Sequence, residues 1–117
     1  MSRLRMLQML IATVFLSAGL AVVPIMAAGT TQTFTGKVSD AMCGAKHTEG
    51  LAPEACVRAC VQKGAKYALV VGDKVYTLDT SDQATLDTLN KLAWEQAKVT
   101  GTAEVATIAV KTVTAAK

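Results

Sequence analysis

The chain has 117 residues, of which 51% are hydrophobic and 18% charged, with 12 Lys and Arg against 9 Asp and Glu. Two of the arginines, Arg3 and Arg5, stand before a long apolar run, and without them the positive excess falls from three charges to one. Such a nearly neutral surface gives no electrostatic reason to bind nucleic acid or an anionic membrane, so we expect neither as a partner.

The N-terminal segment has the pattern of an export signal. The two arginines precede an apolar run over residues 9–25, and the small residues Ala27 and Ala28 offer a cleavage site. The alternative is an uncleaved anchor, because the run approaches the ~20 residues that span a bilayer. A proline near the end of the run favours cleavage. We therefore predict a signal peptide at 1–28 and a periplasmic or secreted domain at 29–117.

Residues 29–117 suffice for one small domain, and most of its segments alternate between apolar and polar residues. This period of two, together with frequent β-branched residues, predicts strands. Gly72 and Asp73 separate two such segments and form a two-residue turn, which predicts a β-hairpin. The full set of predicted strands is 33–42, 67–71, 74–78, 97–104 and 107–113.

Two helices are predicted between the strands. Pro53 suits a first helical position, residues 55–63 follow as a short helix, and Gly64 suits its C-terminal end. For the second helix, Thr80 and Gln83 are spaced as a capping box. An apolar stripe follows them at Leu86, Leu89 and Leu92.

The order of these elements predicts a mainly β fold. Five strands with a helix between the third and the fourth is the order of an OB-fold, a small antiparallel barrel. The cysteine-bearing helix is then part of an insert after the first strand, at 43–64. An open antiparallel sheet with both helices on one face is the alternative. The expected barrel core consists of Phe34, Val38, Leu69, Val75, Val99, Ile108 and Val110.

All three cysteines and the only histidine of the chain lie in this insert. Cys43 stands four positions before His47, and Cys56 stands four positions before Cys60 on one face of the predicted helix. This clustering allows three interpretations: a disulfide with one thiol left over, a metal site, or a redox thiol.

A disulfide is the interpretation that we place first. An exported domain permits disulfides, and a bond from Cys43 to Cys56 or Cys60 would tie the loop to the short helix. Closing that loop contributes roughly 3 kcal/mol in the chain-entropy model. A bond between Cys56 and Cys60 is geometrically poorer, because side chains four apart on a helix are nearly parallel. The partner of Cys43 therefore stays open, and one cysteine is left over in either case.

A metal site is the second interpretation. Three thiolates and one imidazole match a structural zinc site, and the ligands would be Cys43, His47, Cys56 and Cys60. Copper(I) is a softer alternative, with Met42 as a thioether beside Cys43. A single histidine argues against a blue-copper site, which needs two.

A redox thiol is the third interpretation. His47 or Arg58 could lower the pKa of Cys43 or Cys60 and make it reactive, although the spacing differs from the C-x-x-C of thioredoxin-like proteins. The sequence has no Gly-rich phosphate loop and no Ser/His/Asp pattern at a known spacing. We therefore expect a non-enzymatic domain of unknown ligand, as a monomer or weak oligomer.

Asp40 lies on the inward side of the first predicted strand by alternation, three positions before Cys43. One role for it is a hydrogen bond to His47, which would orient the imidazole behind a metal. The other role is to cap the turn after the strand. Both roles stay open.

Residues 35–47 carry Gly36, Val38, Asp40, Cys43, Gly44 and His47, and the Cys-x-x-x-Cys of the predicted helix follows. This resembles a Gly-x-Val-x-Asp-x-x-Cys-Gly-x-x-His pattern of small exported bacterial proteins of unknown function. Residues 64–70 and 99–102 are similar to later strands of that pattern, so the resemblance covers nearly the whole mature chain. It implies an OB-like secreted domain. Residues 94–96 depart from the pattern, which has a Gly- and Lys-rich turn there.

Overall fold

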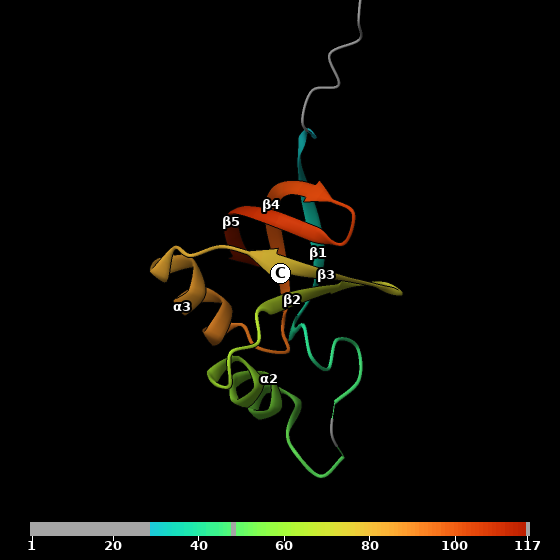
Figure 1. Ribbon diagram of the computed structural model, residues 1–117, viewed down its shortest axis with the longest axis vertical. Helices are drawn as coiled ribbons and strands as arrows, with labels where there is room; N and C mark the ends of the chain where they lie inside the picture. The colour runs from blue at the N-terminus through green and yellow to red at the C-terminus, as the bar shows by residue number, and fades with distance from the viewer. Residues whose placement is uncertain (1–28, 48, 117) are drawn as a thin grey trace, which may run out of the picture.

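The computed structural model describes residues 29–47 and 49–116, and the predicted signal peptide lies outside these ranges. Figure 1 shows the strands gathered together, with α2 at the end of the domain opposite the start of β1. Within the described ranges, no helix is both long and apolar enough to cross a membrane. The elements in chain order are β1 (Thr31–Asp40), α2 (Pro53–Gln62), β2 (Tyr67–Val71), β3 (Lys74–Asp79), α3 (Gln83–Lys91), β4 (Gln96–Glu104) and β5 (Thr107–Ala115).

The five strands form one sheet that closes on itself in the order β1-β2-β3-β5-β4, with β1 pairing both β2 and β4. The mainly β prediction is therefore confirmed. Every pair is antiparallel except β3 with β5, which is parallel. The expectation of a wholly antiparallel arrangement is wrong for this pair. A closed ring with an odd number of strands cannot alternate in direction all the way round, so at least one neighbouring pair must run parallel.

Two glycines allow strands to approach closely inside this ring. A Cβ added at Gly36 of β1 would collide with the carbonyl oxygen of Val70, and one added at Gly101 of β4 would collide with that of Ala109. The register between β4 and β5 also shifts next to Gly101. Glycine is therefore required at both positions because the backbone of the neighbouring strand approaches too closely for a side chain.

The core lies inside the ring. Val38, Leu69, Val99 and Ile108 are all fully buried, as the sequence predicts, and Phe34 and Val110 pack against them while partly buried. Val75, also expected in the core, is only half-buried. Both helices contribute to the core through one fully buried side chain each, Val57 from α2 and Leu89 from α3.

The start of α3 differs from the predicted capping box. Asp82 is the N-cap, and its carboxylate accepts a hydrogen bond from the backbone N–H of Thr85 at 2.9 Å. Thr80 instead accepts a hydrogen bond from the backbone N–H of Asp82. The expectation for Thr80 and Gln83 is wrong because Asp82 stands directly before the helix, where a short acceptor reaches the free N–H groups. By contrast, α2 begins at Pro53 as predicted.

Candidate metal centre

A tight turn after β1 fixes the position of Cys43. The Oδ1 atom of Asp40 accepts hydrogen bonds from the backbone N–H groups of Met42 and Cys43, at 3.0 and 2.9 Å. The backbone carbonyl of Asp40 accepts a further hydrogen bond from Gly44, which has a φ of 59°. Asp40 therefore has the turn-capping role that was one of its two predicted roles.

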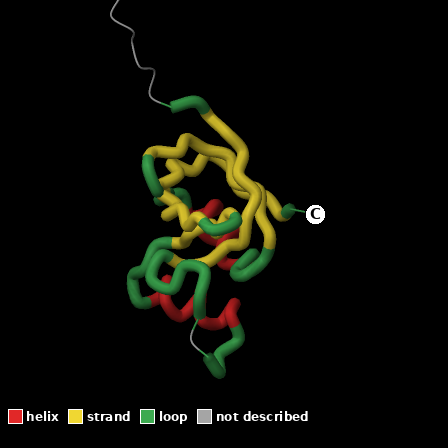
Figure 2. Tube along the Cα trace, turned by 90° about the vertical axis from the view of Figure 1, so that its right-hand side faces the viewer, coloured by secondary structure: helices red, strands yellow, loops and turns green. Residues whose placement is uncertain are grey.

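The helix α2 brings Cys56 and Cys60 to the same place. Val57 is fully buried in the core and so attaches α2 to the barrel end of the domain. The adjacent Cys56 is 4% exposed, and Cys60, one turn later, is half-buried. Figure 2 shows α2 flanked by the loops that contain the rest of the insert. The packing of α2 on the core therefore holds Cys56 and Cys60 near the turn after β1.

The three cysteine side chains converge. The Sγ atoms of Cys43, Cys56 and Cys60 all lie within 4.8 Å of one another, and those of Cys43 and Cys60 are 3.9 Å apart. This separation exceeds the roughly 2.05 Å of a disulfide bond, and all three cysteines are free thiols in the structure. Thiolates bound tetrahedrally to one zinc ion at about 2.3 Å lie about 3.8 Å apart. The three cysteines are therefore close enough to bind one metal ion.

His47 belongs to a neighbouring group of donors. One ligand atom each from Asp40, Cys43 and His47 lie within 4.8 Å of one another, so that Cys43 is common to both groups. The Nδ1 atom of His47 is 4.0 Å from Oδ2 of Asp40, too far for the predicted hydrogen bond. The imidazole also packs edge-on against Trp94, with ring centroids 4.3 Å apart.

Ser39 and Trp94 complete the surroundings of His47, and sequence reasoning missed both. Alternation places Ser39 on the outer face of β1, yet it is fully buried because the insert folds over that face. Its Oγ lies 3.3 Å from Nε2 of His47 and donates to the backbone carbonyl of Gly44. Trp94 has a φ of 62°, and its backbone N–H donates to Val38 at 2.7 Å. A lone serine and an isolated tryptophan gave no pattern that could have revealed these contacts.

The arrangement around His47 is similar to that of the hydrolase triad: the carboxylate of Asp40 faces Nδ1 of the imidazole, and the hydroxyl of Ser39 faces Nε2. A nucleophilic serine must reach its substrate. Ser39 is fully buried and its O–H donates to Gly44. The arrangement therefore secures the loop rather than presenting a nucleophile.

The two half-buried thiols are harder to ionise than an ordinary cysteine. Burial raises the pKa of Cys43, and burial together with the contact to Cys43 raises the pKa of Cys60 from 9.0 to about 11. A reactive redox thiol needs the opposite shift. The sequence offered Arg58 as a group that could lower the thiol pKa. In the structure its Nε instead donates a hydrogen bond to the backbone carbonyl of Asn90 in α3, at 3.1 Å.

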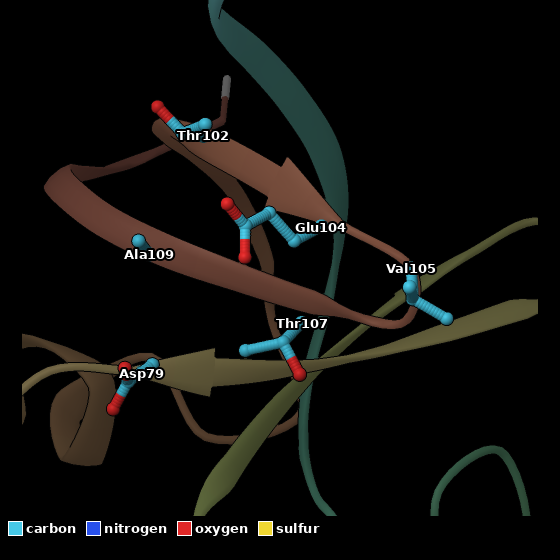
Figure 3. A pocket seen from close by; sticks show the side chains of 6 residues that line it. All are labelled: Asp79, Thr102, Glu104, Val105, Thr107 and Ala109. Atoms are coloured by element: carbon cyan, nitrogen blue, oxygen red, sulfur yellow. The ribbon is translucent and has the colours of Figure 1, made fainter. Parts of the chain in front are cut away.

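A separate open pocket of about 470 Å³ lies at the β4–β5 turn, lined by residues of β3, β4 and β5 (Figure 3). Its two carboxylates are those of Asp79 and Glu104, and Asp79 already pairs with Lys66 at 3.5 Å. Among the described residues, neither carboxylate belongs to a group with metal-ligand spacing. The pocket therefore supports no assignment of function.

No family model matches the chain, and it has no significant match among curated proteins or solved structures. The chemistry of the site is therefore inferred from the residues of this chain alone.

Proposed function

We propose that residues 29–117 form an exported, non-enzymatic, OB-like barrel domain whose insert binds a thiophilic metal ion through Cys43, Cys56 and Cys60. The observation that carries the proposal is the mutual approach of the three Sγ atoms within 4.8 Å. Sulfur donors favour soft or borderline ions, so zinc and copper(I) are the candidates.

The geometry favours a metal ion over a disulfide because it involves all three thiols. A disulfide between Cys43 and Cys60 would use two of them and leave Cys56 as a buried thiol beside the bond. A metal ion accepts all three at once, and the 3.9 Å between Cys43 and Cys60 is close to the spacing of two thiolates on one zinc ion. The metal interpretation therefore moves ahead of the disulfide.

The bound ion would act as a structural cross-link. It would join the turn after β1 to α2, between which the described residues 44–47 and 49–52 form neither helix nor strand. Small domains bury a limited core, so such a cross-link adds appreciably to their stability. Metal binding to a site absent from the unfolded chain is itself folding free energy.

Two further parts of the proposal have separate support. The closed strand order with α3 between β3 and β4 supports an OB-like barrel. The basic start, the apolar run and the small residues Ala27 and Ala28 support export. The resemblance to small exported bacterial proteins agrees with both.

A disulfide between Cys43 and Cys60 is the second candidate, favoured by the 3.9 Å between their Sγ atoms. Bond formation would have to bring these atoms to roughly 2.05 Å. This candidate also acts as a structural cross-link, but it excludes the metal because both thiolates are consumed.

A competition titration with a chromophoric chelator tests the metal centre. Reduced protein should remove zinc or copper(I) from the chelator, and Cys56→Ser or Cys60→Ser should weaken the binding at least about 100-fold. One ligand of three contributes several of the roughly 10–16 kcal/mol that structural zinc sites provide. Thr88→Ser, a change on α3 away from the insert, is the control. Wild-type affinity in both cysteine variants would contradict the proposal.

A further inference from the structure

Two buried polar atoms have no hydrogen-bond partner within the described residues: Oδ2 of Asp40, at the end of β1, and Nδ1 of His47, in the insert. Asp40 is fully buried, and the side chain of His47 is 6% exposed. Leaving a buried carboxylate oxygen or an imidazole nitrogen without a partner is costly, and native proteins rarely do so. Both atoms face the same space, 4.0 Å apart.

The remaining polar atoms of these two side chains are already engaged. Oδ1 of Asp40 accepts hydrogen bonds from the backbone N–H groups of Met42 and Cys43. Nε2 of His47 lies 3.3 Å from the hydroxyl oxygen of Ser39. These contacts hold the two unpartnered atoms toward each other. Their 4.0 Å separation exceeds the roughly 2.7–3.2 Å of an N–H···O hydrogen bond. It lies within the roughly 4 Å that two zinc–ligand bonds of about 2.0–2.2 Å can span.

The Sγ atom of Cys43 borders the same space. Asp40, Cys43 and His47 each present one ligand atom, and these atoms lie within 4.8 Å of one another. Carboxylate oxygen, thiolate sulfur and imidazole nitrogen are the three donor types that zinc takes from proteins. Three protein ligands with a fourth position left for water is a common zinc arrangement.

The charges of the insert match two divalent ions better than one. Ionised, the three cysteines and Asp40 carry four negative charges, which two zinc ions neutralise. One zinc ion would leave two of those charges uncompensated in a largely buried place, which is unfavourable. In the described part of the chain, the one side chain within ion-pair distance of Asp40 is His47. No lysine or arginine there is placed to compensate the charge of the Asp40 carboxylate.

We propose that Asp40, Cys43 and His47 form a second zinc position, joined to the three-thiolate centre by Cys43 as a bridging thiolate. This inference rests on the proposed metal centre and extends it to a two-ion site. The sequence predicted His47 as a ligand of one ion shared with all three cysteines. Here His47 binds a second ion, and Asp40 becomes a direct ligand rather than a partner of the imidazole.

Counting zinc ions on reduced protein by native mass spectrometry tests the second position. Wild-type protein should bind two zinc ions, and Asp40→Asn or His47→Ala should bind one. Asp79→Asn removes an exposed carboxylate outside the insert and should still bind two. Trp94, the only tryptophan, touches His47, so its fluorescence should change mainly as the second position fills. Retention of one ion by the variants would show that the insert still folds.

Two results would overturn the second position. The first is a wild-type protein that never binds more than one zinc ion, together with a Cys60→Ser variant that binds none. In that case only the three-thiolate centre would exist. The other is two ions in wild type, Asp40→Asn and His47→Ala alike. A wild-type protein that binds no zinc would instead refute the three-thiolate centre, so the two failures are distinguishable.

Discussion

The strand ring and the cysteine insert are stabilised by different means. In the ring, backbone groups pair strand to strand and the core side chains Val38, Leu69, Val99 and Ile108 are fully buried. Among its described residues the insert has one helix, attached to the core by Val57, together with turns and irregular loop. Its thiols and its imidazole gather beside the carboxylate of Asp40 at the end of β1.

This difference separates what the chain needs to fold from what it needs to bind. In the ring, each strand pairs with a neighbour on both sides. The insert and the adjoining Asp40 have two unpartnered buried polar atoms and three converging thiols. Buried polar atoms need a partner, and a metal ion bound by these donors would supply one. Changes in the apolar core of the ring should therefore alter stability without altering metal binding, and changes in the insert should alter metal binding first.

The largest expected effect is a cavity in the ring. Leu69→Ala truncates a fully buried side chain and should lower the free energy of unfolding by about 2–5 kcal/mol. Leu51→Ala makes the same truncation in the insert, where Leu51 is 56% exposed, and should change stability by less than about 0.5 kcal/mol. Urea unfolding measures both. Equal losses in the two variants would contradict the comparison.

Zinc should stabilise the whole domain through the insert alone. At a free zinc concentration 100 times the dissociation constant, the free energy of unfolding should rise by about 2.7 kcal/mol. Cys60→Ser should abolish most of this increase, whereas Leu69→Ala should keep it although the starting stability is lower. Thermal unfolding of reduced protein with and without zinc measures the increase. The same gain in Cys60→Ser would count against the thiolate centre.

Alkaline pH should weaken the reduced, zinc-free protein through its thiols. Because folding raises the pKa of Cys60 from 9.0 to about 11, the folded state favours the protonated thiol. This contribution is complete below pH 9 and is lost as the pH rises toward 11. Unfolding measured across this window should show a steeper decline for wild type than for Cys60→Ser. Parallel profiles would show that Cys60 is not buried as described.

The smallest effect is expected for a surface ion pair of the ring. Lys66 and Asp79 lie 3.5 Å apart, with side chains 63% and 60% exposed. Lys66→Ala should change the free energy of unfolding by less than about 1 kcal/mol and leave zinc binding unchanged. A larger loss in urea unfolding, or weaker zinc binding, would mean that this pair supports the insert.

The sequence predicted the ring better than the insert. Alternation identified all five strands and core residues such as Leu69 and Ile108, because a period of two reports directly which side faces the core. It could not predict the parallel pairing of β3 and β5, which depends on how the ring closes. The N-cap Asp82 was missed because Thr80 and Gln83 offered a competing pattern.

The candidate site was predicted by residue type and not by arrangement. Cysteine and histidine are few, so Cys43, His47, Cys56 and Cys60 could be selected from the sequence as one cluster. Their division into two groups that share Cys43 depends on the turn that Asp40 holds. Burial of Ser39 depends on the insert covering β1, and no local pattern in the sequence encodes that contact.

Intact mass spectrometry of protein purified without chelator tests the central claim most directly, because it reports bound metal and thiol oxidation together. Under native conditions the protein should carry metal, and after denaturation its mass should correspond to three free thiols. A metal-free protein whose denatured mass is lower by two hydrogen atoms, with Cys43 and Cys60 joined in peptide mapping, would contradict a metal centre and establish the disulfide.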